Sequence, residues 1–126
     1  MANILVVDDD PDVREAVEDL LARSGHQITT AGDGAQAKPL LRPGEFDLII
    51  TDVKMPGMSG FDLLREIRQT CRDIPVILMT GFPSKEGILD SLFEGAFGYV
   101  EKPFDPHYLV SLVGQALLRK TGPALR

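Results

Sequence analysis

The stretch Ile4-Leu5-Val6-Val7-Asp8-Asp9-Asp10-Pro11 decides the fold. Its first four residues form a short apolar run with three β-branched side chains, which is typical of a strand buried on both faces of a parallel sheet. Acidic residues follow where that strand would end. Asp10-Pro11 has the pattern of a helix start, a carboxylate N-cap followed by proline at the first helical position. The stretch therefore predicts a buried strand, an acidic loop and a helix, in that order.

Strand and helix patterns alternate along the rest of the chain in the same way. Apolar residues from Val13 to Leu21 recur at helical spacing, and Ser24-Gly25 ends that helix. Strict alternation with short loops indicates right-handed βαβ units, so we expect an α/β fold with a doubly wound parallel sheet of five strands and five helices. The expected strands cover residues 4–7, 27–31, 46–51, 76–79 and 98–101, and the helices begin near residues 11, 35, 60, 84 and 106.

One residue departs from this pattern. Pro39 falls inside the second expected helix, residues 35–42. A proline in a helix interior costs about 3 kcal/mol and kinks the element. We therefore expect the second helix to be short or distorted.

Length and composition limit the classes of protein that the chain can belong to. Its 126 residues suit one domain, and 13 Lys+Arg against 19 Asp+Glu give a net charge of −6. This acidic balance argues against direct binding to nucleic acid or to an anionic membrane. The lone Cys71 cannot form an internal disulfide, which fits a reducing compartment, and it is expected to fill a helix end. With no signal peptide or membrane span visible, we expect a cytoplasmic protein.

Polar residues follow four of the expected strands at the point where each strand ends. These residues are Asp8 and Asp9, then Asp52, Thr80 and Lys102. Because ligands of an open parallel sheet bind at the carboxyl ends of its strands, we expect these side chains to meet at one edge. Carboxylates crowded together repel one another, and a hard divalent cation with oxygen ligands, Mg²⁺ rather than zinc, relieves that repulsion. A carboxylate, a cation and a lysine form a plausible site for phosphoryl transfer.

Each of these residues also has a simpler interpretation when it is taken alone. Asp10 is expected only to cap a helix, the acidic pair before it could be solvated loop charge, and a single Thr80 or Lys102 could lie on the surface. The coincidence of all four strand ends at one edge favours a functional site. His26 and His107 have no metal-ligand partner nearby in the sequence and are expected at the surface.

Four segments together resemble the receiver domain of two-component response regulators, over about residues 3–119. Chemotaxis receivers are flavodoxin-like with strand order 2-1-3-4-5, so the resemblance implies that order here. The segments that carry the resemblance are Ile4–Asp10, Asp52–Gly60, Met79–Gly81 and Tyr99–Phe104.

The resemblance implies a phosphoacceptor and its metal ligands. Asp52 resembles the aspartate that accepts the phosphoryl group. Asp8 and Asp9 resemble the carboxylates that hold Mg²⁺ with that aspartate, and the main-chain carbonyl of Lys54 resembles a further ligand.

The resemblance also implies a switch. Lys102 resembles the lysine that pairs with the phosphoryl group, Thr80 the hydroxyl that moves onto it, and Tyr99 the aromatic residue that then turns inward. The bond before Pro103 is usually cis in the family. The expected readout surface comprises the fourth helix, the fifth strand and the fifth helix, where Phe97 and Tyr108 also lie, and Phe97 could equally be core.

Two positions are expected to tune the lifetime of the phosphorylated state. Lys54 and Phe82 lie two residues beyond Asp52 and Thr80, where family members adjust dephosphorylation. A bulky Phe82 is expected to hinder the attacking water.

The sequence thus predicts a phosphoacceptor signalling domain that catalyses only its own phosphorylation and dephosphorylation. Its expected partners are a sensor histidine kinase or phosphotransfer protein, with an output domain or a homodimer as further possibilities. Residues 1–120 would form the receiver domain, and residues 121–126 a tail or the start of a linker. Two alternatives stay open: a haloacid-dehalogenase-like phosphatase with Asp8 as nucleophile, although Asp12 stands where its motif has Thr, and a phosphate-independent interaction module.

Overall fold

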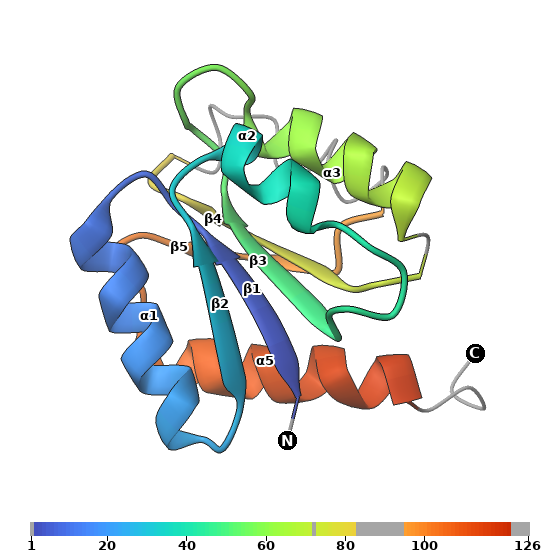
Figure 1. Cartoon of the computed structure of the whole chain (residues 1–126). Helices are drawn as coiled ribbons and strands as arrows, with labels where there is room; N and C mark the ends of the chain where they lie inside the picture. Colours follow the sequence, from blue (N-terminus) through green and yellow to red (C-terminus); the bar gives the residue numbers. More distant parts are fainter. Residues whose placement is uncertain (1, 72, 83–94, 122–126) are drawn as a thin grey trace.

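A computed structural model of the chain describes residues 2–71, 73–82 and 95–121. Its centre is a parallel five-stranded sheet in the order β2-β1-β3-β4-β5, which confirms the predicted fold (Figure 1). The helix expected from Ser84 lies outside the described residues. The elements are β1 (Asn3–Val7), α1 (Pro11–Arg23), β2 (Gln27–Ala31), α2 (Gly34–Ala37), the 3₁₀ turn η1 (Lys38–Leu40), β3 (Leu48–Asp52), α3 (Gly60–Thr70), β4 (Val76–Thr80), β5 (Gly98–Glu101) and α5 (Pro106–Thr121).

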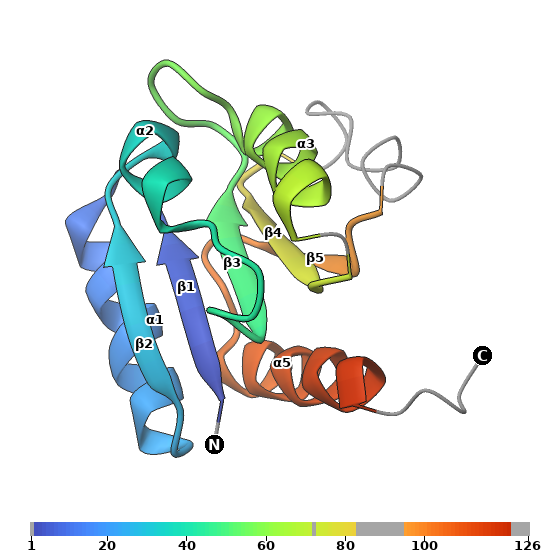
Figure 2. The same cartoon turned by 45° about the vertical axis from the view of Figure 1, so that its right-hand side comes forward.

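The sheet separates two apolar cores, one on each face. Successive side chains of a strand point to opposite faces, so Ile4 and Val6 of β1 join one core while Leu5 and Val7 join the other. Helices α1 and α5 cover the first face, and α2 and α3 cover the second (Figure 2). The continuous apolar runs of β1, β3 and β4 are therefore explained by burial on both sides.

The predicted helix starts are confirmed by their caps. The side chain of Asp10 accepts a hydrogen bond from the Asp12 amide at 2.9 Å, and Pro11 is the first residue of α1. Ser59 and Asp62 form the reciprocal capping box of α3. One detail was wrong: Ala16, expected on the apolar face of α1, is exposed, because the face that packs on the sheet centres on Val17 and Leu21.

The second helix is short, as predicted. Helix α2 has four residues, and the chain then tightens into η1, in which Pro39 lies. A proline is tolerated early in such a turn because the amide of that position needs no partner within the helix. The distortion is confined to this segment and leaves β3 in register with both of its neighbours.

Two strand ends differ slightly from the prediction. Both β3 and β4 run one residue further, so Asp52 and Thr80 are the last residues of their strands. The bond between Lys102 and Pro103 is cis, as the resemblance implied. Among the described residues, no helix combines the length and apolar character needed to cross a bilayer.

Gly60 is required by the way the loop after β3 folds back on that strand. A Cβ at Gly60 would collide with the carbonyl oxygen of Asp52 and lie 2.8 Å from Cα of Val53. Because both neighbours are main chain, Gly60→Ala is expected to lower the free energy of unfolding by about 3 kcal/mol, the upper end for overpacking. In Gly114→Ala, the matched control in α5, the Cβ has open space, so stability should rise by about 0.5–1 kcal/mol. Urea unfolding followed by circular dichroism measures the free energy of unfolding of both variants. Equal values for Gly60→Ala and Gly114→Ala would contradict the requirement for glycine at position 60.

Candidate functional site

Three carboxylates meet at the carboxyl-terminal edge of the sheet. Asp8 follows β1, Asp9 follows it in the loop to α1, and Asp52 ends β3. One carboxylate oxygen from each residue lies within 4.8 Å of the others. The convergence predicted from the sequence is therefore observed, and it joins residues that are 43 or 44 positions apart in the chain.

The carboxylate of Asp8 is completely buried and held from several directions. Its Oδ1 accepts a hydrogen bond from the amide of Asp10 at 2.9 Å, and its own amide donates to the carbonyl of Ala31 at 3.1 Å. Its Oδ2 lies 2.9 Å from Nζ of Lys102. Asp8 thus has a fixed position between β1, β2 and the segment after β5.

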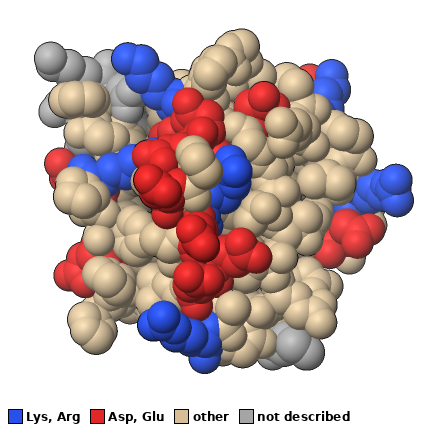
Figure 3. All heavy atoms as spheres, turned by 60° about the vertical axis from the view of Figure 1, so that its left-hand side comes forward, with Lys and Arg blue, Asp and Glu red and all other residues tan. Residues whose placement is uncertain are grey.

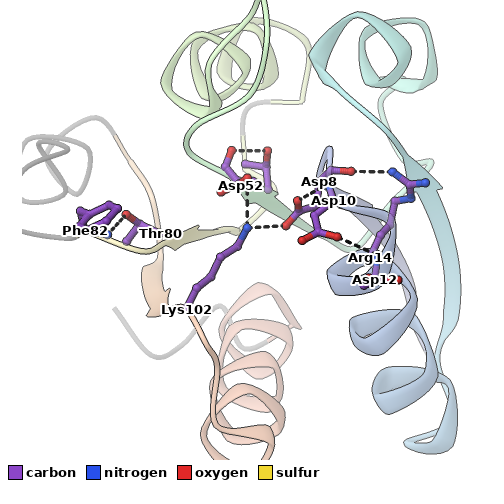
Figure 4. A network of polar contacts seen from close by, with 9 residues as sticks. Asp8, Asp10, Asp12, Arg14, Asp52, Thr80, Phe82 and Lys102 are labelled. Carbon is purple, nitrogen blue, oxygen red and sulfur yellow. Dashed lines mark hydrogen bonds and ion pairs between the residues drawn. The ribbon is translucent and has the colours of Figure 1, made fainter.

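Lys102 links the two buried acids (Figure 4). Its Nζ lies 2.9 Å from Oδ2 of Asp8 and 3.2 Å from Oδ2 of Asp52. Its amide donates to the carbonyl of Thr80 at 2.7 Å, which continues the pairing of β5 with β4 and directs the side chain to this edge. Burial by itself lowers the pKa of Lys102, but hydrogen bonding and the charges of Asp8 and Asp52 outweigh it and raise that pKa above its ordinary value.

The pKa of Asp52 is shifted in the direction expected of a crowded acid. The pKa of this carboxyl is raised to about 6, chiefly by loss of hydration on burial and then by the charge of Asp8, while Lys102 opposes both effects. The cluster also sets three carboxylates against the single ammonium of Lys102. The site carries an uncompensated negative charge.

The donor set fits a hard divalent cation. All three converging groups are carboxylates, and Oδ2 of Asp8 accepts no well-aligned hydrogen bond from the described residues although the Lys102 ammonium lies near it. A buried carboxylate oxygen with unused lone pairs, beside a solvent-exposed acid such as Asp9, is a suitable ligand for a cation that keeps part of its water shell. The cluster could therefore hold a metal ion.

The remaining predicted residues lie outside this cluster, Thr80 at the same edge and Tyr99 within β5. Thr80 is buried, and its Oγ1 accepts a hydrogen bond from the amide of Phe82 at 3.0 Å, apart from Asp52 and Lys102 in Figure 4. Tyr99 is 36% exposed, and Lys54 is exposed after β3. The structure thus brings together Asp8, Asp9, Asp52 and Lys102, and leaves the hydroxyl of Thr80 turned toward Phe82.

One contact was missed by the sequence analysis. Nη1 of Arg14, in the first turn of α1, donates to the main-chain carbonyl of Asp8 at 2.7 Å. Figure 4 shows the arginine lying alongside the acidic loop. No sequence signal indicated this contact, because Arg14 lies between apolar positions of the helix and resembles an ordinary solvent-facing residue.

The surface beside the site is acidic. Figure 3 shows Asp and Glu side chains gathered on the face that α1 presents. An oppositely charged partner surface would approach this face most readily. The exposed acids of the β1–α1 loop and of α1 are Asp9, Asp10, Asp12, Glu15 and Asp19.

Comparison with known proteins identifies the family. The family model of the response regulator receiver domain matches residues 4–114. The chain belongs to the response regulator receiver domain family. The receiver domain of a solved structure from Clostridium thermocellum has a TM-score of 0.89 and 32% identity, with 96% of this chain and 98% of that chain covered. The phosphatase alternative finds no support in these matches.

Relatives of two lengths carry the same domain. The chemotaxis protein CheY of Pseudomonas aeruginosa is 37% identical over 122 residues, which cover 94% of this chain and 98% of that protein. The DNA-binding transcriptional regulator NtrC of Azospirillum brasilense is 40% identical over 123 residues, 98% of this chain but only 26% of that protein. The chain thus spans about a quarter of the length of some of its relatives and nearly all of others.

Removal of the Asp52 charge is expected to stabilise the fold at neutral pH. The folded state raises the pKa of this acid from 3.8 to about 6, so its ionised form is disfavoured by folding. In buffer without divalent cations, Asp52→Asn should be about 1–2 kcal/mol more stable than the wild type at pH 7.5, after allowance for solvent screening. The difference should shrink as the pH falls through 6 and vanish well below 3.8, where the wild-type acid is protonated in both states. Urea unfolding across this range measures it, and a difference independent of pH would contradict the raised pKa.

Proposed function

We propose that Asp52 is the phosphoacceptor of this receiver domain. The observation that carries the proposal is the position of its carboxylate, at the end of β3, 3.2 Å from the ammonium of Lys102 and beside Asp8 and Asp9. The donor is a phosphohistidine of a sensor histidine kinase or phosphotransfer protein, or a small phosphodonor. An oxygen of Asp52 bonds to phosphorus while the donor's bond to phosphorus breaks, and the histidine nitrogen keeps that electron pair.

The proposed cofactor is Mg²⁺. Asp8, Asp9 and Asp52 would hold it, with the main-chain carbonyl of Lys54 as a further ligand. When bound, the ion neutralises charge on the phosphoryl oxygens. Lys102 contributes a second positive charge, because its ammonium already lies 3.2 Å from one oxygen of the Asp52 carboxylate.

Hydrolysis returns the domain to its resting state. A water oxygen bonds to phosphorus, the bond from phosphorus to Asp52 breaks, and inorganic phosphate leaves with the carboxylate restored. The chain therefore acts on its own phosphoryl group and is proposed to turn over no separate substrate.

The proposed switch residues are Thr80 and Tyr99. A phosphoryl group adds about −1.5 to −2 charge and strong acceptors at Asp52, if the acyl phosphate resembles other phosphoresidues. The Thr80 hydroxyl would leave the Phe82 amide, to which it is now bonded, and move onto that group. Tyr99 lies on β5, one strand further out, and its partly exposed ring would turn inward.

The signal is proposed to leave through β5, α5 and the helix that the sequence predicts before β5, which lies outside the described residues. Moving a two-state equilibrium from 1:99 to 99:1 takes about 5.5 kcal/mol of differential stabilisation. The receiver comprises residues 1–120 and continues into a tail or linker at 121–126. Its output is an attached domain or a homodimer of the receiver rather than direct contact with nucleic acid or membrane, and the proposed location is the cytoplasm.

Radiolabel transfer tests the phosphoacceptor. Wild-type protein incubated with labelled acetyl phosphate and Mg²⁺ is expected to become labelled. Asp52→Asn is expected to lose the label because Asp8, the other carboxylate beside Lys102, is completely buried. The control Asp73→Asn, an exposed acid before β4, should be labelled normally. Label retained by Asp52→Asn would refute the assignment, and wild-type protein without Mg²⁺-dependent label would favour the phosphate-independent interaction module.

Phe82 is proposed to slow hydrolysis by hindering water. Its side chain is 59% exposed, and its amide is the hydrogen-bond donor to Thr80 at the same edge as Asp52. Phe82→Ala should therefore shorten the half-life of the labelled protein, and Lys54→Ala should change it as well. Tyr108→Ala, which removes an exposed aromatic ring on α5, serves as the control and should leave the half-life unchanged. Equal half-lives of the wild type and the Phe82→Ala variant would refute the proposal.

A further inference from the structure

We infer that Arg14 is a positioning residue for the metal-binding carboxylate of Asp8. The inference deepens the proposed function and rests on it, because it concerns the same Mg²⁺ site. The hydrogen bond of Arg14 goes to a main-chain carbonyl and not to a carboxylate. It holds the main chain from which the Asp8 carboxylate projects.

The hydrogen bond of Arg14 completes the restraint of Asp8. Strand β1 ends at Val7, and the amide of Asp8 makes one further ladder bond to the carbonyl of Ala31. The carbonyl of Asp8 is bonded instead by Nη1 of Arg14 at 2.7 Å. With Oδ1 bonded to the amide of Asp10, three atoms of the same residue are fixed, and the remaining Oδ2 is directed to Lys102 and the metal cluster.

The loop after β2 is shaped to accept the guanidinium. A Cβ at Gly32 would lie 3.3 Å from Nη1 of Arg14 and equally close to Oε1 of Gln36. The amide of Gly32 donates to that same Oε1 at 2.9 Å, and the amide of Gln36 donates to Asp33 at 2.8 Å. The absence of a side chain at Gly32 therefore leaves room for Arg14 beside an already ordered loop.

The positive charge of Arg14 is unfavourable in two respects. We therefore assign the role of Arg14 to its hydrogen bond and not to its charge. A cation in the first turn of a helix is opposed by the helix dipole, which favours acids there. A positive charge close to a cation site also repels the cation. If Arg14 acted through its charge alone, its loss would strengthen Mg²⁺ binding. If it positions Asp8, its loss weakens Mg²⁺ binding.

Titration calorimetry with Mg²⁺ distinguishes these outcomes, because the two roles predict opposite changes in Mg²⁺ affinity. Arg14→Met keeps the length of the side chain and removes the donor, and it is expected to raise the Mg²⁺ dissociation constant about tenfold, as loss of an outer ligand-orienting contact does. Arg14→Lys retains the charge and one donor and should recover part of the affinity. Affinity that is unchanged or tighter in Arg14→Met would overturn the inference.

Two further variants separate positioning from charge and from folding. Arg23→Met removes an equal charge from the exposed last turn of α1 and should leave Mg²⁺ affinity unchanged. Gly32→Val retains Arg14 but crowds its Nη1, and it should weaken Mg²⁺ binding in the same direction as Arg14→Met. If Arg14→Met fails to fold by circular dichroism, Gly32→Val decides, and wild-type affinity in that variant overturns the inference.

The same measurements distinguish an error in the proposed phosphoacceptor function from an error in the role of Arg14. Wild-type protein that neither binds Mg²⁺ nor accepts label from acetyl phosphate would contradict the proposed function and the role of Arg14 with it. Wild-type protein that binds Mg²⁺ and is labelled, with variants of equal affinity, would contradict only the role of Arg14.

Discussion

Electrostatic repulsion among three carboxylates at one edge of a parallel sheet is the constraint on which the site depends. Two unit charges about 4 Å apart repel by about 1–4 kcal/mol, depending on the effective dielectric constant. The single ammonium of Lys102 lies between Asp8 and Asp52 and relieves only part of this repulsion. Together with burial, which is the larger cause, this repulsion raises the pKa of Asp52, and it makes the site suitable for a cation.

The rest of the fold makes this arrangement possible. The strands that deliver the acids lie between two apolar cores and are buried where they end, so their ends cannot separate without exposing those cores to water. The caps at Asp10 and Ser59 begin the two helices that follow the acidic strand ends. Gly60 then lets the loop after β3 lie directly on the main chain of Asp52.

Contacts around Thr80 connect the site to the outer strand. Its carbonyl accepts the amide of Lys102, while its hydroxyl accepts the amide of Phe82. The same residue therefore lies between the lysine that contacts Asp52 and the loop after β4. Under the proposed switch, Thr80 donates its hydroxyl proton to the new acceptor at Asp52, and the movement this requires would break the bond that its oxygen accepts from Phe82. That movement is what would transmit phosphorylation toward Tyr99.

The sequence by itself determined the alternation of strands and helices, the caps, the distortion at Pro39 and the sheet edge at which the acids lie. These follow from periodicity and from local hydrogen bonding, which neighbouring residues control. The strand order required the family resemblance, because local patterns do not specify which strands pair. Tertiary structure alone decided that Lys102 is shared by Asp8 and Asp52, that the hydroxyl of Thr80 faces Phe82, and that Arg14 holds the carbonyl of Asp8. Each of these contacts depends on a side-chain conformation and on main chain positioned by packing, and neither is encoded in residue spacing.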